Sequence, residues 1–562
     1  MNYKVHINSS NYEDWELLTE FEMKKIIIED SSFNPLKYRL LSGDVINNDY
    51  KIIHSPYRND NNIPGILLFT GKSYGRTKNG KGKLIYKCVP HNKRLPSFLI
   101  PYEEKSMGFN KNKANKYILF KYDNWLEKHP TGIITTTIGN IEDLSSFYEY
   151  QLYCKNLFIS IKDFTKDVNN AYKKASENSF IDDILKKNPQ IEKRLDDYII
   201  SIDPTSSTDL DDAMCLNGDI LSIYIANVPV LMEHFNLWSS FSERISTIYL
   251  PDRKCPMMPS LLSENLCSLL ENKQRFTFCV DIKIKNNEII DVSFKNVLIC
   301  VKKNYRYDDK VLENDEMYKK ILALSQNLTK KYKYVKDIKD SHDLVAYLMI
   351  LMNYESANIM EKYKTGIFRT LTLNDSDEIN KTELDDDIYK FIKMWQSSSG
   401  QYSSFNDKTG HAYVGDGLDN YIHITSPIRR LVDLLNMMNI QKHLKLLSMS
   451  SSGVEFYNNW IGRLEYINTT MRAIRRVQTD CTMLNMFKKN PLMIDVIYYG
   501  YVFDRVKWRN QYLQYTVYIP ELKTVTRVNI KHDIKDYSRH KFRLYLIEDG
   551  VTLKQKIRAE MI

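Results

Sequence analysis

Four carboxylates lie close together in the segment 201–216, between two apolar stretches; they are Asp203, Asp209, Asp211 and Asp212. Unpaired charges buried in an apolar segment would be destabilising, and like charges this close repel one another unless a cation lies among them. Mg²⁺ binds through such hard oxygen ligands and leaves positions open for water and phosphate. The cluster therefore predicts a one- or two-metal site for phosphoryl chemistry. The alternative is a solvated turn that Asp203-Pro204 opens.

A second candidate for chemistry is the pair Arg429-Arg430. Ser426 is a good N-cap, Pro427 suits the first helical position, and apolar residues recur at helical spacing over 431–438. The sequence therefore predicts a helix with two arginines in its first turn, where the helix dipole disfavours cations. Either a phosphate binds there, or the arginines pair with carboxylates such as those of the aspartate cluster.

Composition describes an ordinary globular protein of several domains, with 562 residues, 43% hydrophobic and 27% charged. The formal net charge of +9 favours a polyanionic partner. Eight scattered cysteines show no zinc-site spacing, and the acidic segment 375–387 fails the EF-hand pattern and predicts a solvated helix start. The amino terminus lacks the apolar run of a signal peptide, and the longest apolar stretch, around 344–352, is too short to span a bilayer. We therefore expect an intracellular protein, located in the cytoplasm.

Hydrophobic alternation predicts β-rich regions at both ends of the chain. Residues 1–60 and 61–155 read as two small β-domains, and the tail from 491 alternates again, whereas 160–198 is charged and helical in pattern. The loop that carries Lys72 and Arg76 interleaves cations with an aromatic residue, Tyr74. This loop suits an OB-type barrel that follows a single nucleic-acid strand; the alternative is a solvated basic loop.

Three long motifs resemble those of the ribonuclease II (RNB) family of exoribonucleases, in the family's order. Asp-Pro, four residues, then Asp-Leu-Asp-Asp-Ala over 203–213 resembles its catalytic motif. The segment 249–269 resembles its Tyr-Leu-Pro to Leu-Cys-Ser-Leu region, and 421–435 resembles its Thr-Ser-Pro-Ile-Arg-Arg region. The segments 89–96 and 123–139 are similar to the second cold-shock domain of the eukaryotic exosome-type (Dis3-like) members.

The resemblance implies an α+β multidomain fold, in which OB-fold β-barrels flank a central α/β RNB catalytic domain. The expected domains are a short cold-shock-like OB domain (1–60), a second cold-shock OB domain (61–155), the RNB domain (156–490) and a C-terminal OB-fold RNA-binding domain (491–562). No PIN-type nuclease domain precedes them in this sequence, which argues against docking on an exosome core. Two positions depart from the family pattern, with Tyr224 for a usual His and Asn227 for a usual Asp.

The implied activity is processive, Mg²⁺-dependent 3′→5′ hydrolysis of single-stranded RNA with a free 3′ end, releasing 5′-nucleoside monophosphates. By the resemblance, Asp203, Asp209 and Asp212 hold Mg²⁺, for which Mn²⁺ substitutes, and Asp211 completes a two-metal site. Arg429 contacts the substrate near the scissile phosphate, with Arg430 as second candidate. The enzyme would be a monomer.

Two tyrosines match family positions that stack on or clamp the 3′-terminal nucleotides, namely Tyr249 and Tyr307. Without that match each would be read as a half-buried core tyrosine. Two other functions stay open. One is a catalytically inactive RNB-like protein that binds RNA, against which the intact aspartates argue. The other is a nuclease for single-stranded DNA.

Overall fold

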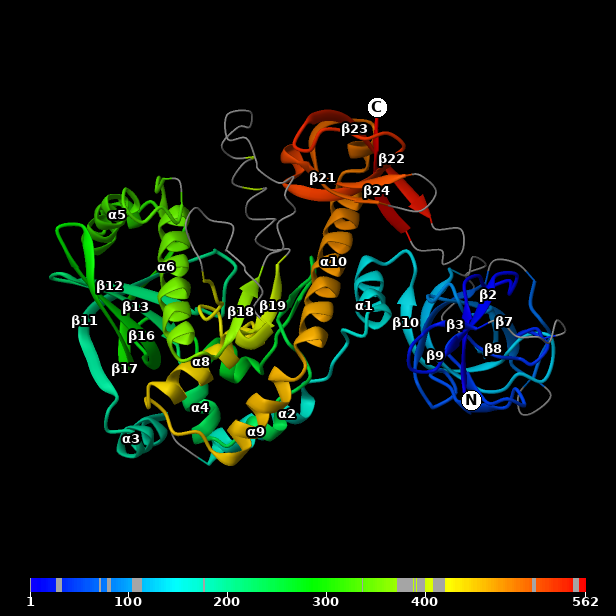
Figure 1. The fold of residues 1–562 in the computed structure, drawn as a ribbon, viewed down its shortest axis with the longest axis horizontal. Coiled ribbons are helices and arrows are strands. Elements are labelled where there is room, and N and C mark those ends of the chain that lie inside the picture. The colour runs from blue at the N-terminus through cyan, green and yellow to red at the C-terminus, as the bar shows by residue number, and fades with distance from the viewer. Residues whose placement is uncertain are drawn as a thin grey trace. The chain divides into compact units, whose positions relative to one another are not determined.

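The computed structural model describes residues 2–26, 33–69, 72–77, 82–103, 114–174, 177–335, 337–370, 388, 391, 400–407, 420–507, 512–548 and 555–562. The acidic segment 375–387 lies outside these residues. The chain divides into two compact units. One comprises Met1–Phe158, Leu250–Asp252 and Arg475–Ile562, and the other comprises Ile159–Tyr249 and Arg253–Ile474 (Figure 1).

The amino-terminal region forms two antiparallel five-stranded sheets, as the alternating pattern predicts. Their strand orders are β3-β2-β1-β4-β5 and β10-β9-β6-β7-β8. A backbone bridge between Leu99 and Thr131 joins the two outer parts of the second sheet and curls it towards a barrel. The strands are β1 (Tyr3–Ile7), β2 (Trp15–Thr19), β3 (Lys25–Ile26), β4 (Val45–Ile46), β5 (Ile52–His54), β6 (Ile63–Leu68), β7 (Leu84–Pro90), β8 (Phe98–Tyr102), β9 (Lys116–Tyr122) and β10 (Gly132–Asn140).

The carboxyl-terminal region forms a third five-stranded sheet, with the order β22-β21-β20-β23-β24. The alternation in 513–519 predicts a strand, and β21 spans those residues. Inward side chains of this strand, such as Tyr515 and Val517, are fully buried. The strands are β20 (Ile497–Lys507), β21 (Leu513–Ile519), β22 (Thr524–Ile530), β23 (Arg539–Glu548) and β24 (Gln555–Met561).

The second unit is built on a closed barrel of the strands β11-β12-β13-β16-β17. Asn286 and Asn287 join the last two strands in a two-residue turn, and both have the positive φ that such a hairpin turn requires. The strands are β11 (Glu192–Asp203), β12 (Asp212–Asn217), β13 (Ile220–Ala226), β16 (Gln274–Lys285) and β17 (Glu288–Arg306), with the short pairs β14 (Ile248–Tyr249) with β15 (Lys254–Cys255) and β18 (Ile367–Thr370) with β19 (Gln401–Ser404).

One sequence-based expectation about this region is wrong. The charged segment 192–198 was expected to continue a helix, and it forms the first half of strand β11. Residues 192–194 pair in parallel with 297–299 of β17, so long-range backbone hydrogen bonds override the local pattern.

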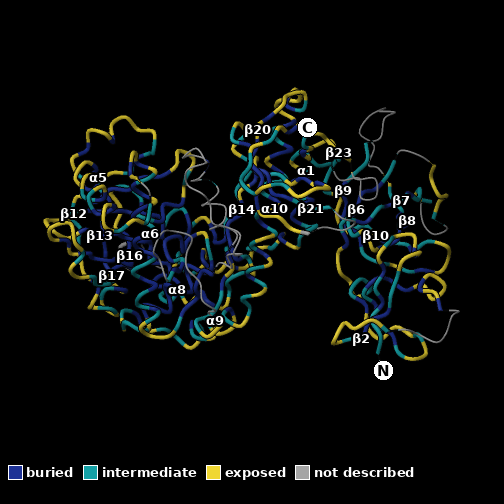
Figure 2. Tube along the Cα trace, turned by 45° about the horizontal axis from the view of Figure 1, so that its top comes forward, coloured by how far each residue is buried: buried dark blue, intermediate teal, exposed yellow. Residues whose placement is uncertain are grey.

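Helices pack against one face of the barrel strands. Apolar residues of β13 and β16 share a core with α5 and α6, and α8 is almost entirely buried (Figures 1 and 2). No helix within the described ranges combines the length and apolar character needed to cross a membrane. The helices are α1 (Leu144–Cys154), α2 (Lys162–Lys173), α3 (Glu177–Lys187), α4 (Val228–His234), α5 (Glu316–Thr329), α6 (Ser341–Lys362), α8 (Leu431–His443), α9 (Ser451–Ile461) and α10 (Leu464–Lys489).

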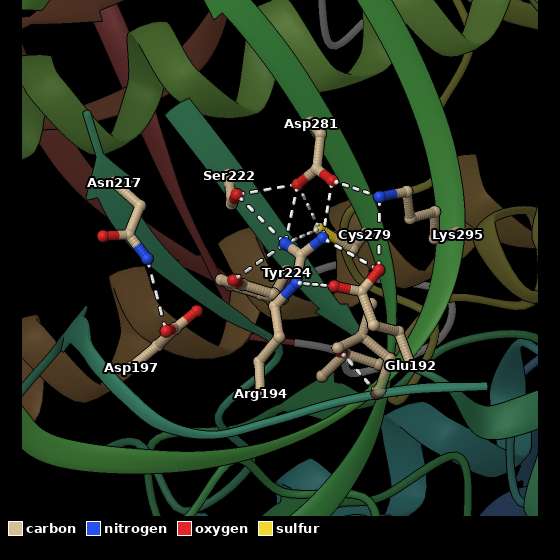
Figure 3. A network of polar contacts seen from close by, with 11 residues as sticks. Glu192, Arg194, Asp197, Asn217, Ser222, Tyr224, Cys279, Asp281 and Lys295 are labelled. Carbon is tan, nitrogen blue, oxygen red and sulfur yellow. Dashed lines mark hydrogen bonds and ion pairs between the residues drawn. The ribbon is translucent and has the colours of Figure 1, made fainter. Parts of the chain in front are cut away.

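A polar network lies on the opposite face of the same strands (Figure 3). Both terminal nitrogens of Arg194 bind the carboxylate of Asp281, at 2.8 and 2.6 Å, and Arg194 also donates to the hydroxyl of Tyr224 at 3.2 Å. Lys295 lies 3.2 Å from the same carboxylate. Although burial opposes its ionisation, the hydrogen bonds from Arg194 and Ser222 hold the pKa of Asp281 below its ordinary value. The unusual Tyr224 thus serves a structural ion-pair network.

Three buried amides close a ring between the barrel and α8. The Asn227 amide donates to Asn296 at 2.9 Å, Asn296 donates to Gln441 at 3.0 Å, and Gln441 donates back to Asn227 at 3.0 Å. Asn227 also accepts a hydrogen bond from the amide of Val230 as the N-cap of α4. An amide satisfies these contacts, whereas a carboxylate could not donate, which explains why Asn stands where Asp is usual.

Replacing Gln441 by Leu should destabilise this unit by about 2 kcal/mol, because it removes the two buried hydrogen bonds that Gln441 makes with Asn227 and Asn296. Urea unfolding followed by tryptophan fluorescence measures the loss. Gln441→Glu, whose side chain has nearly the same size as Gln, is measured beside it for comparison. An unfolding midpoint unchanged by Gln441→Leu would contradict the structural importance of the ring.

Candidate active site

The four aspartates lie where β11 ends and β12 begins. Asp203 is the last residue of β11, Asp212 is the first of β12, and Asp209 and Asp211 lie in the connecting loop. Asp203, Asp209 and Asp211 are only 6%, 7% and 3% exposed. The solvated-turn interpretation is therefore wrong, because such a turn would leave the carboxylates in water.

Burial makes ionisation of this cluster unfavourable. Loss of solvent contact raises the pKa of Asp203 to about 6 and that of Asp211 to about 7. Burial, with the charges of Asp203 and Asp211, raises the pKa of Asp212 well above its ordinary value. The cluster therefore requires additional positive charge to be fully ionised at neutral pH.

The donor set suits a hard cation, although two carboxylates already have positively charged neighbours. All the side-chain donors are carboxylate oxygens, which Mg²⁺ prefers, and the buried Oδ2 of Asp212 has no hydrogen-bond partner. Among the described residues, no three His, Cys, Asp or Glu side chains are grouped so as to hold a metal ion as they stand. Two of the carboxylates, Asp209 and Asp211, bind a lysine and an arginine.

Arg429 is the positive neighbour of Asp211. Its Nε lies 3.1 Å from Oδ2 of Asp211, and the backbone amide of Ile428 donates to Oδ1 at 3.2 Å. The side chain of Arg429 is 47% exposed, so part of the guanidinium remains open to a ligand. The interpretation of the arginines as partners of the aspartate cluster is thus confirmed for Arg429.

The predicted helix start at Ser426 is wrong. Helix α8 begins at Leu431, after Arg430 in an extended conformation with φ −143°. The backbone of 429–431 pairs with 245–247 instead, since the carbonyl of Arg429 accepts from Thr247 and the amide of Leu431 donates to Ile245. Arg430 does not contact the aspartate cluster. Its Nη2 donates to Oδ1 of Asp433, in the first turn of α8, at 2.8 Å.

Lys254 is the positive neighbour of Asp209, and it is not among the site residues expected from the sequence. Its Nζ lies 3.0 Å from Oδ1 of Asp209, 2.8 Å from Oε1 of Glu264 and 2.7 Å from the hydroxyl of Thr208. Lys254 lies inside the segment 249–269, which resembles an RNB-family region, and this position is the sequence signal that could have identified it. The neighbouring Ser268 accepts from the amide of Leu210 at 3.0 Å and so holds the aspartate loop.

The two candidate tyrosines lie near the cluster, on different elements. Tyr249 is 42% exposed and pairs with Lys254 in the β14–β15 hairpin. Burial, together with Asp212 and Asp203, raises the pKa of Tyr307 above its ordinary value, and the ring of Tyr307 stacks on His342 with centroids 3.8 Å apart. Tyr249 is open to solvent, whereas Tyr307 is partly buried and packs against the hydrophobic core, as a half-buried core tyrosine would.

The two basic candidates in the amino-terminal unit, Lys72 and Arg76, are both exposed. Arg76 donates to the carbonyl of Gly82 at 2.8 Å, across its own loop. Their exposure fits both a binding loop and a solvated one, so a role in binding RNA stays a prediction.

Comparison with protein families decides which domain this geometry belongs to. Residues 193–331 match the RNB domain. The chain carries an RNB domain. Residues 85–150 match the Dis3-like cold-shock domain 2 (CSD2). The RNB match contains the four aspartates, Lys254 and both tyrosines, and the resemblance to RNB-family ribonucleases is confirmed.

The relatives of this RNB-domain chain are exonucleases and ribonucleases by name. DIS3-like exonuclease 2 of Schizosaccharomyces pombe is 31% identical over 244 residues, which are 40% of this chain and 25% of that protein. Ribonuclease R of Buchnera aphidicola subsp. Acyrthosiphon pisum is 27% identical over 337 residues, 46% of each chain. The chain thus spans a quarter to about half of the length of these relatives.

Solved structures share the whole fold of the RNB-domain chain. RNase R of Mycoplasma genitalium, in complex with ribose methylated single-stranded RNA, superimposes with a TM-score of 0.68 at 16% identity and covers 100% of both chains. Yeast Ssd1, a pseudonuclease, gives 0.57 at 14% identity and covers 97% of this chain and 80% of Ssd1. The expected α+β multidomain fold with RNB and cold-shock OB domains is confirmed.

Proposed function

We propose that this protein is a processive, Mg²⁺-dependent 3′→5′ exoribonuclease that degrades single-stranded RNA to 5′-nucleoside monophosphates. Its relatives support RNA degradation in general. The observation that carries the proposal is the buried aspartate cluster at the β11–β12 junction, with an unpartnered oxygen on Asp212 and the half-exposed Arg429 beside it.

Each residue of the cluster has a defined part in the proposed reaction. Asp203, Asp209, Asp211 and Asp212 would hold Mg²⁺, which when bound activates water and stabilises charge on phosphate oxygens. The open side of Arg429 would bind the scissile phosphate and neutralise the charge that develops on it. Tyr249 would stack on the terminal base. Arg430 positions the start of α8 through Asp433 and is a weaker candidate for phosphate contact.

The direct test is digestion of 5′-labelled single-stranded RNA with Mg²⁺ and, in parallel, with a chelator. A descending ladder or a short labelled limit product that requires Mg²⁺ would support the proposal, and it would also give the direction of degradation. Loss of the labelled 5′ nucleotide at early times would contradict it. Matched RNA and DNA oligonucleotides test whether the enzyme prefers RNA.

The second candidate function is RNA binding without catalysis. The likeness to the Ssd1 pseudonuclease keeps it open, since that protein shares the fold. Retention of all four aspartates favours the enzyme, because a binding protein needs no buried anionic cluster at that position. RNA that stays full length with Mg²⁺ and still shifts on a native gel would establish the inactive binder.

We further propose that the protein acts as a monomer in the cytoplasm, without stable attachment to an exosome core. Scattered cysteines suit a reducing compartment. Light scattering on the purified protein and co-purification from its host test both points; a stoichiometric exosome ring would contradict the second.

Tyr249→Ala should weaken binding of a short single-stranded RNA by roughly tenfold, because base stacking on one aromatic ring contributes about 1–3 kcal/mol. The ring is 42% exposed and therefore available for stacking. Tyr249→Phe, which keeps the ring, should bind as the wild type does. Fluorescence anisotropy in Ca²⁺ measures both affinities, and equal weakening in the two variants would contradict the stacking role.

A further inference from the structure

An ammonium group lies within the candidate metal site. The Nζ of Lys254 is surrounded by three oxygens, from Asp209 at 3.0 Å, Glu264 at 2.8 Å and the hydroxyl of Thr208 at 2.7 Å. Thr208 in turn donates to Glu264 at 3.0 Å, which links two of the three partners. Lys254 thus neutralises one carboxylate of the cluster without any metal.

The two carboxylates that share Lys254 differ in position. Asp209 belongs to the aspartate cluster, and its side chain is 6% exposed, whereas the side chain of Glu264 is 33% exposed. Glu264 lies on the π-helical turn Leu261–Leu266, which the amide of Cys267 closes by donating to Leu262 at 2.9 Å. Such turns occur often at functional sites. Because Glu264 lies outside the aspartate cluster and binds Lys254 as well, it can retain the ammonium away from Asp209.

We infer that Lys254 is an exchangeable internal cation, which occupies Asp209 when no divalent metal is bound and is retained by Glu264 when the metal takes its place. The inference rests on the proposed function in one respect, namely that Asp209 is a metal ligand. It makes Lys254 a positioning residue that sets the affinity for the metal.

Electrostatics gives the reason for exchange rather than coexistence. A divalent ion on the carboxylate of Asp209 would lie close to the ammonium that this carboxylate binds at 3.0 Å, and the two cations would repel. We therefore expect the metal to displace the ammonium. The apparent affinity for the metal is then lowered by the free energy needed to break the Lys254–Asp209 contact. Glu264 lowers that cost because it offers the ammonium a second carboxylate.

The test measures Mn²⁺ binding to the full-length protein by electron paramagnetic resonance of the free ion, at neutral pH and without RNA. Lys254→Met should bind Mn²⁺ about tenfold more tightly than the wild type, which corresponds to about 1.4 kcal/mol. Glu264→Gln should bind several-fold more weakly, because Asp209 then remains the only carboxylate for Lys254. Lys254→Arg, which keeps the charge, should stay near the wild type.

The matched control is Lys331→Met. Lys331 forms a comparable contact with Glu288 at 2.6 Å, where both side chains are exposed, and its removal should leave Mn²⁺ affinity unchanged. Equal or weaker Mn²⁺ binding by Lys254→Met, or unchanged binding by Glu264→Gln, would overturn the inference. If Lys254 had only a structural role, Lys254→Met would bind Mn²⁺ more weakly. Tighter binding therefore distinguishes the exchangeable cation from a structural residue.

RNA digestion by the wild type separates this inference from the proposed function. If RNA is degraded and Lys254→Met leaves Mn²⁺ affinity unchanged, the inference fails and the function stands. If RNA is not degraded and Lys254→Met still tightens Mn²⁺ binding, the function fails and the cation exchange stands.

Discussion

Asp211→Asn is expected to reduce RNA hydrolysis on the order of a thousandfold or more, while RNA binding is retained. Asp211 is 3% exposed, and its two oxygens accept from Arg429 and from the amide of Ile428. Asn removes the charge that would hold both the metal and Arg429 at the scissile phosphate. Single-turnover digestion of 5′-labelled RNA measures the rate, and a native gel measures binding.

The control for this substitution is Asp219→Asn, which lies in the same domain on an exposed turn. It removes an identical charge outside the cluster and should leave the rate unchanged. Hydrolysis by Asp211→Asn within tenfold of the wild type would contradict the assignment of Asp211. Retained RNA binding by Asp211→Asn on the native gel would show that a loss of hydrolysis does not come from unfolding.

The metal-free protein should lose stability as the pH rises from about 4 to about 7, and Mg²⁺ should restore it. Burial raises the folded-state pKa of Asp203 to about 6 and of Asp211 to about 7, above the ordinary value of 3.8. Between those values the folded state binds more protons than the unfolded chain, so stability falls as the pH rises. The raised pKa of Asp203 alone corresponds to roughly 3 kcal/mol.

Thermal unfolding at several pH values, in a chelator and in Mg²⁺, tests this behaviour. The unfolding temperature in chelator should fall between about pH 4 and about pH 7, the range set by the ordinary and the raised pKa values of the two carboxyls. The stabilisation by Mg²⁺ should be greatest above that range. Asp203→Asn, which removes one titrating group, should flatten the profile in chelator. A profile that is flat in the wild type, or equal stabilisation by Mg²⁺ at acid and neutral pH, would contradict the prediction.

The sequence alone determined the parts of the site that are close together in the chain. Asp203 to Asp212 form one short segment, so their spacing was readable without a fold. The same holds for β21, because the alternation in 513–519 predicts the strand that the structure contains. Local alternation was sufficient to predict that strand, although the structure buries residues 515–519 on both faces of it.

Tertiary structure alone decided how the charges are paired. Arg429 meets Asp211 across 218 positions of the chain, and Lys254 meets Asp209 across 45. Long-range backbone pairing likewise explains why 192–198 form a strand and why α8 begins only at Leu431. The sequence determined which charges are present in this protein. Only the fold decided which carboxylates are neutralised and which stay open, because burial and partner distance set the energy of a charge, and neither is a local property.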